Sequence, residues 1–71
     1  MTDTTLLRSI IDESGMTITA IAKKCGIARG TLYNKLAGKG EFTASEIASL
    51  TAILFLSRRE RDDIFFAKRL H

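Results

Sequence analysis

The basic residues are the side chains of this sequence whose spacing points to a shared chemical role. Between Glu13 and Glu41 there is no acidic residue, whereas the basic residues in that interval are Lys23, Lys24, Arg29, Lys35 and Lys39. The interval therefore carries a charge of +5, while the other six basic and eight acidic residues sum to −2. A basic stretch on a near-neutral body indicates a surface that faces a polyanion, such as nucleic acid.

Catalytic and metal-binding chemistry has little support in the sequence. The single histidine, His71, is the last residue, and the single cysteine is Cys25. A histidine-dependent triad, a multi-histidine metal site and an internal disulfide are therefore not expected. Asp62 and Asp63 are adjacent, so they do not share a helix face as paired catalytic carboxylates would. We expect no enzyme activity, no cofactor, no metal and no small-molecule substrate.

The length and composition limit the class of protein. A chain of 71 residues, of which 45% are hydrophobic and 27% charged, is expected to form a single domain over residues 1–71. Its longest apolar run, residues 52–56, is far shorter than the roughly 20 residues that cross a bilayer, and the N-terminus lacks a signal-peptide pattern. We therefore expect a cytoplasmic protein that does not bind membranes.

Helices are the elements that must position the basic residues. Proline and valine are absent and apolar residues recur every three or four positions, which favours helices over strands. We expect a compact all-α bundle of five short helices. They cover residues 4–14, the segment between Thr17 and Gly26, residues 29–37, and two segments that begin after Thr43 and Ser57.

The predicted helix starts and stops have recognisable signals. Asp3 and Thr17 are suitable N-caps, and the pairs Thr43/Glu46 and Ser57/Glu60 have the spacing of capping boxes. Glycines supply the left-handed stops at residues 15, 26 and 38. Between the second and third helices only a short turn remains, which is the organisation of a helix-turn-helix.

The segment from Thr17 to Lys39, TITAIAKKCGIARGTLYNKLAGK, resembles the Cro/repressor-type (XRE-like) helix-turn-helix of temperate phages and their bacterial relatives. Residues 42–66 resemble the tail of very small phage regulators, some Cro-like and some modulators of repression. The resemblance implies a lambda-repressor-like fold in a bacterial host cell, with the helix at 29–37 in the major groove of an operator. It also implies that Arg29, Gly30 and Asn34 face bases.

The helical period agrees in part with these implied contacts. At about 100° per residue, Leu32 and Leu36 define the buried face of the third helix, and Gly30, Tyr33 and Asn34 lie opposite. Arg29 can reach a guanine edge and Asn34 can pair with adenine, while Tyr33 suits a phosphate or a thymine methyl group. The predicted phosphate contacts are Thr17, Lys23, Lys24, Thr31, Lys35 and Lys39.

Two functions therefore stay open. The first is a transcriptional regulator that binds a pseudo-palindromic DNA operator as a homodimer. The second is an antirepressor that occupies a partner helix-turn-helix repressor through an exposed Ile18, a position where relatives often carry a polar residue. Phe65 and Phe66 are adjacent and thus about 100° apart, so we expect one ring in the core and the other on a partner surface. Cys25 is predicted to be a buried core residue.

Overall fold

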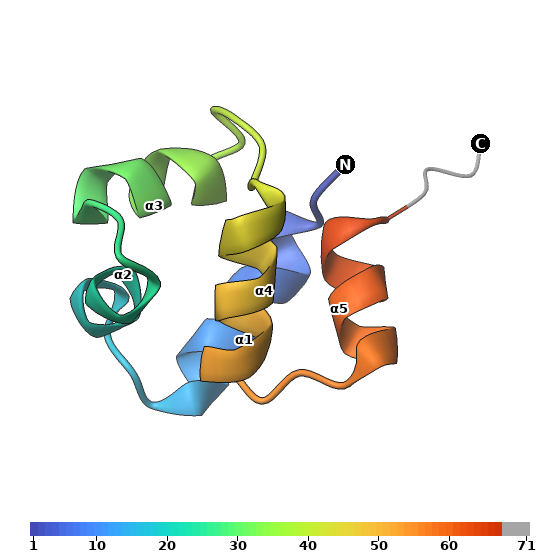
Figure 1. The fold of residues 1–71 in the computed structure, drawn as a ribbon. Coiled ribbons are helices and arrows are strands. Elements are labelled where there is room, and N and C mark those ends of the chain that lie inside the picture. Colours follow the sequence, from blue (N-terminus) through green and yellow to red (C-terminus); the bar gives the residue numbers. More distant parts are fainter. Residues whose placement is uncertain (68–71) are drawn as a thin grey trace.

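The computed structural model describes residues 1–67, and its regular elements are five helices (Figure 1). They are α1 (Thr4–Ser14), α2 (Ile18–Cys25), α3 (Arg29–Leu36), α4 (Ala44–Ile53) and α5 (Arg58–Phe65). The expected all-α bundle is confirmed, and the third helix ends one residue earlier than predicted, at Leu36. Residues 68–71, which include His71, lie outside the described residues.

The helices are arranged around α4. In Figure 1, α4 runs through the centre of the molecule, with α2 and α3 on one side of it and α5 on the other. Helix α2 packs against both α3 and α4, and α1 packs against α3 and α5. This arrangement leaves one side of α3 at the edge of the molecule. Among residues 1–67, none of the helices is long and apolar enough to span a membrane.

Side-chain caps start four of the helices at the predicted positions. Asp3 accepts a hydrogen bond from the Leu6 amide at 3.0 Å, and Thr17 accepts one from the Ala20 amide at 3.0 Å. Both predicted capping boxes are formed, by Thr43 with Glu46 and by Ser57 with Glu60. The local sequence therefore fixes the beginnings of α1, α2, α4 and α5.

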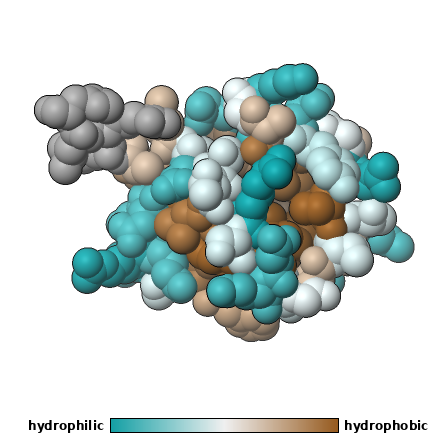
Figure 2. All heavy atoms as spheres, turned by 180° about the vertical axis from the view of Figure 1, so that it is seen from behind, coloured by the Kyte–Doolittle hydropathy of each residue, from teal (hydrophilic) through white to brown (hydrophobic). Residues whose placement is uncertain are grey.

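The hydrophobic core draws side chains from all five helices. Its fully buried members are Leu7, Ile21, Leu32, Leu50 and Ile64. Phe42, from the α3–α4 connection, meets Phe65 of α5 edge to face, with 5.5 Å between the ring centroids. On the face opposite that of Figure 1, apolar side chains reach the surface in patches separated by hydrophilic ones (Figure 2).

The structure resolves the question of the adjacent phenylalanines. Phe65 is 3% exposed and belongs to the core, so it does not offer a partner surface, whereas Phe66 is 56% exposed. Two burial predictions need correction. Ile18 is half-buried against the core instead of exposed, and Cys25 is half-buried instead of fully enclosed. Ile18 is the first and Cys25 the last residue of α2, so each lies at an end of a helix of eight residues, where the core covers it only in part.

Candidate nucleic-acid interface

The α2–α3 unit has a three-residue turn, Gly26 to Ala28, between its helices. Gly26 has a φ of 75°, the left-handed region that glycine adopts without steric cost. The amide of Ile27 donates to the Ala22 carbonyl at 3.1 Å and the amide of Gly26 to that of Lys23 at 3.2 Å, which is a Schellman arrangement. Ala22 is buried and Ile27 packs on the core, so the turn holds α3 across α2.

Helix α3 has one buried and one exposed face, as its period predicts. Leu32 and Leu36 are buried, and the predicted base-facing residues Arg29, Gly30, Tyr33 and Asn34 are all exposed. The Arg29 guanidinium lies over the Tyr33 ring, 5.4 Å from its centroid. Such a cation–π contact keeps Arg29 extended along the exposed face. The spacing of four residues between Arg29 and Tyr33 is the sequence signal for this contact.

The start of α3 is suited to an anion. Its N-cap residue, Ala28, has an extended backbone but no polar side-chain atom with which to cap the helix. The first-turn amides of an uncapped helix point outward and, together with the helix dipole, favour a phosphate. Thr31, in this first turn, is exposed. Thr17 is also exposed, and its hydroxyl oxygen accepts a hydrogen bond from the Ala20 amide. The hydroxyl hydrogen is therefore available to another acceptor.

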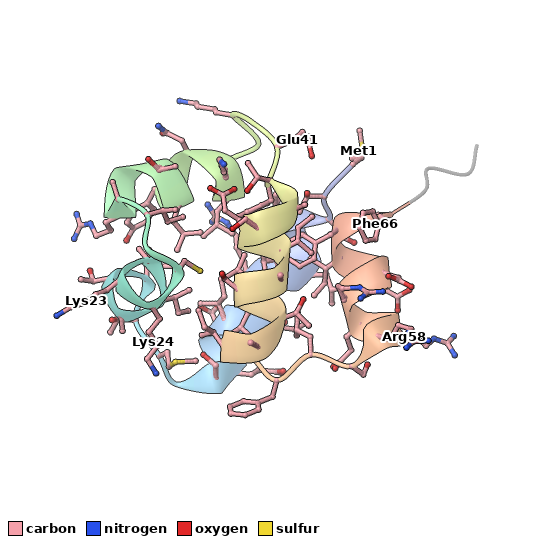
Figure 3. The ribbon with its side chains drawn as sticks, viewed as in Figure 1. Met1, Lys23, Lys24, Glu41, Arg58 and Phe66 are labelled. Carbon is pink, nitrogen blue, oxygen red and sulfur yellow. The ribbon has the colours of Figure 1, made fainter. Side chains whose placement is uncertain are left out.

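The predicted phosphate-binding cations are not equivalent in the structure. Lys23, Lys24 and Lys39 are exposed, as is Arg29, which was predicted to contact a base. In Figure 3, Lys23 extends outward at the edge of the molecule, whereas Lys24 extends away from α3 in that view. The structure thus presents Lys23, Arg29 and Lys39 around α2 and α3, and it places Lys24 on a different side of α2.

Lys35 differs from the other cations because it is bound to α4. Its Nζ lies 2.5 Å from Oε1 of Glu46, and the two side chains are 15% and 12% exposed. The same nitrogen lies 5.8 Å from the centroid of the Phe42 ring. Lys35 therefore points into the body of the protein, and its predicted phosphate contact gains no support from its position.

The Glu46 carboxyl has a perturbed pKa. Partial burial acts to raise this pKa, but hydrogen bonds from Lys35 and Thr43 and the charge of Lys35 outweigh it, so the pKa of Glu46 is lowered from its ordinary value. Burial, with a smaller contribution from the Glu46 charge, raises the pKa of the Cys25 thiol. Cys25 is therefore protonated and unreactive at neutral pH. The sequence pattern predicts Glu46 only as a capping residue and does not predict its ion pair with Lys35.

A small pocket lies beside the exposed face of α3. It has a volume of about 160 Å³ and is lined by Arg8, Ile11, Asp12, Ile18, Tyr33 and Leu36. Because α1, α2 and α3 each contribute, no local sequence pattern predicts it. Among residues 1–67, there is no group of three histidine, cysteine or acidic side chains that could hold a metal ion.

Comparison with known proteins supports the assignment of the α2–α3 unit. Residues 10–39 match the family model described as the helix-turn-helix domain of resolvase. No curated protein and no solved structure matched the chain. The matched segment covers the end of α1, all of α2 and α3, and the first three residues of the connection after α3. The chain therefore contains a helix-turn-helix of the DNA-binding class.

Proposed function

We propose that the protein is a non-enzymatic transcriptional regulator of the temperate-phage switch type, in which α3 enters the major groove of duplex DNA. The observation that carries this proposal is the exposed face of α3, where Arg29, Tyr33 and Asn34 stand together beside an uncapped helix start. A single helix of eight residues covers few base pairs. Two protomers on a pseudo-palindromic operator would double that contact.

Base contacts and phosphate contacts have separable roles in this proposal. Arg29 donates two hydrogen bonds to a guanine edge, and Asn34 pairs with the major-groove edge of an adenine. Lys39, exposed just after α3, contacts a phosphate and carries no sequence information. The roles are distinguishable because loss of a base contact lowers discrimination between sequences, while loss of a phosphate contact lowers affinity for all of them.

The experiment is a fluorescence-anisotropy titration against a duplex selected from a random library and against a scrambled duplex. Asn34→Ala and Arg29→Ala are each expected to cost about 1–3 kcal/mol on the selected duplex and to relax the preference at one base pair. Lys39→Ala is the matched control and should weaken both duplexes alike. Equal loss on both duplexes for Arg29→Ala and Asn34→Ala would refute direct readout by α3.

Salt dependence gives an independent measure of the phosphate contacts. With Lys23, Arg29 and Lys39 as the cations near DNA, the slope of log affinity against log salt should be about −2.7 per protomer. A flat dependence would exclude DNA as the main ligand.

A second candidate function is supported by the pocket beside α3. Ile11, Ile18 and Leu36 form its apolar part, and Arg8 and Asp12 supply opposite charges. An apolar side chain of a partner repressor could insert there and cover Tyr33, so that one surface would serve either DNA or protein. In this antirepressor function, Ile18→Gln weakens a complex with the product of a neighbouring repressor gene and preserves the fold. Isothermal titration that detects no complex with that repressor would dispose of the candidate.

A further inference from the structure

The buried face of helix α3 is narrow. Its buried side chains, Leu32 and Leu36, lie one turn apart on the same face. Two contacts in line resist movement along the helix, but they resist rotation about that line poorly. Ala28 offers no side-chain cap that would add a third point of attachment. The orientation of the exposed face therefore depends on a contact at the side of the helix.

The Lys35–Glu46 pair is such a lateral contact. Lys35 precedes Leu36 by one position and so lies about 100° around the helix from it. Its Nζ reaches Glu46 in the first turn of α4, eleven positions further along the chain. Oε1 of Glu46 also accepts the Thr43 amide at 2.9 Å, so one carboxylate oxygen holds both the start of α4 and the side of α3.

The loop between α3 and α4 completes this contact. The Lys39 amide donates to the Asn34 carbonyl at 2.8 Å and the Gly38 amide to the Lys35 carbonyl at 3.1 Å, which closes the end of α3. A Cβ on Gly40 would stand 4.0 Å from Cγ of Lys35, so the loop passes alongside the lysine stem. The ammonium group then faces Phe42, which packs on Phe65. Lys35 thus connects the end of α3 with the core.

We propose that Lys35 and Glu46 are positioning residues that set the orientation of α3, and with it the placement of Arg29 and Asn34 on base edges. The inference rests on the proposed DNA-binding function. Hydrogen-bonded base contacts tolerate displacements of only about 0.5 Å, so a rotation of α3 that leaves its leucines buried is enough to lose them. In this role, Lys35 acts through α3 and does not contact a phosphate.

Substitution of Glu46 distinguishes the two roles of Lys35, because a positioning role predicts weaker binding to DNA and a phosphate contact predicts stronger binding. Glu46→Gln keeps a side chain that can complete the capping box but removes the ion pair. If Lys35 positions α3, Glu46→Gln and Lys35→Met each weaken binding to the selected duplex roughly 3- to 30-fold, and the double variant is no weaker than either one. If Lys35 is a phosphate contact, Glu46→Gln releases it and strengthens binding.

Glu60→Gln is the matched control. Glu60 occupies the same capping-box position in α5, where it accepts the Ser57 amide at 2.8 Å. The ion pairs among residues 1–67 are Lys35–Glu46 and Arg61–Asp62, so Glu60 takes part in neither. Glu60→Gln should leave the affinity for DNA unchanged. Unchanged or tighter binding by Glu46→Gln would overturn the positioning role.

Amide hydrogen exchange tests the same inference without DNA. Glu46→Gln should speed exchange of the Gly38 and Lys39 amides at the end of α3, relative to the wild type and to Glu60→Gln, and leave the Leu7 amide of α1 unchanged. If the wild-type chain binds no duplex, the proposed function fails but this measurement still decides the positioning role. Equal exchange at the end of α3 in all three proteins would overturn it.

Discussion

The starts of α3 and α4 are built in opposite ways. Helix α4 begins with a complete capping box, in which Thr43 and Glu46 satisfy each other's backbone amides, and α5 repeats it with Ser57 and Glu60. Helix α3 follows Ala28, an N-cap residue with no capping group, and is fixed by Leu32, Leu36 and the Lys35 ion pair. The scaffold helices are therefore specified locally, whereas the candidate recognition helix depends on tertiary contacts and leaves its first-turn amides for a ligand.

Helix α3 and the α4–α5 side of the molecule also differ in their exposed aromatic side chains. On α3, Tyr33 is 45% exposed but covered on one side by Arg29. On the α4–α5 side, Phe55 is 90% and Phe66 56% exposed. Phe66 stays a candidate for the predicted partner surface, and Phe55 is an exposed aromatic residue that sequence analysis did not single out. The exposed ring of α3 is thus paired with a cation, whereas two exposed phenylalanine rings lie at the ends of α5.

The largest effect is expected from Phe65→Ser. This change removes a buried ring and its contact with Phe42, so it should lower the free energy of unfolding by about 3 kcal/mol or more. Phe66→Ser should leave the melting temperature nearly unchanged and, if Phe66 lies in a protein contact, lower the oligomeric mass. Thermal melts and sedimentation velocity measure both. Equal destabilisation by the two changes would mean that Phe66 also belongs to the core.

A smaller effect is expected at the helix starts. Thr43→Ala removes a cap and should cost about 1 kcal/mol, whereas Ala28→Ser adds one at an extended backbone and should gain about as much. Because the new hydroxyl would accept a hydrogen bond from a first-turn amide of α3, that amide would no longer be available to a phosphate. We therefore expect Ala28→Ser to gain stability without gaining affinity for DNA. Chemical denaturation of both variants provides the measurement. A destabilised Ala28→Ser variant would contradict the comparison of the two helix starts.

A still smaller gain in stability is expected from Phe55→Gly. Phe55 has a φ of 54° and is the only residue other than glycine with a positive φ among residues 1–67. Its amide and that of Leu56 close α4 in a Schellman arrangement. Glycine adopts this conformation without steric cost, and the exposed ring gives up little packing. We therefore expect a gain of roughly 0.5–1 kcal/mol by chemical denaturation. A loss of stability would show that the ring is packed in solution, for example against a second protomer.

The Glu46 carboxyl gives the smallest effect, and it depends on pH. Its pKa is lowered in the folded state from the ordinary value of 4.5, so its ionised form stabilises the fold above that pH. This contribution is lost as the pH falls from about 4.5 through the lower folded-state pKa. The melting temperature of the wild type should therefore fall relative to that of Glu46→Gln as the pH is lowered below about 4.5. Parallel pH profiles for the two proteins would contradict the pKa assignment.

Much of the fold was predictable because its signals are local. The caps at Asp3 and Thr17, both capping boxes and the leucine pair of α3 need only neighbouring residues, and the structure has them where the sequence predicts them. The candidate site was predictable where it lies on a single helix face. The Lys35–Glu46 pair and the pocket beside Tyr33 were not, since each joins different helices. The choice between Phe65 and Phe66 likewise required the packing of α5.

Amide chemical shifts of the labelled chain, recorded during addition of a selected duplex of about 20 base pairs, test the central claim most directly. The account predicts that the largest shifts fall on α3, from Arg29 to Leu36, and on the beginning of α2 at Thr17, while α5 changes little. Salt should reverse these shifts. Shifts concentrated around Phe55 and α5, or absent from α3 at saturating duplex, would contradict the claim that α3 is the DNA-binding element.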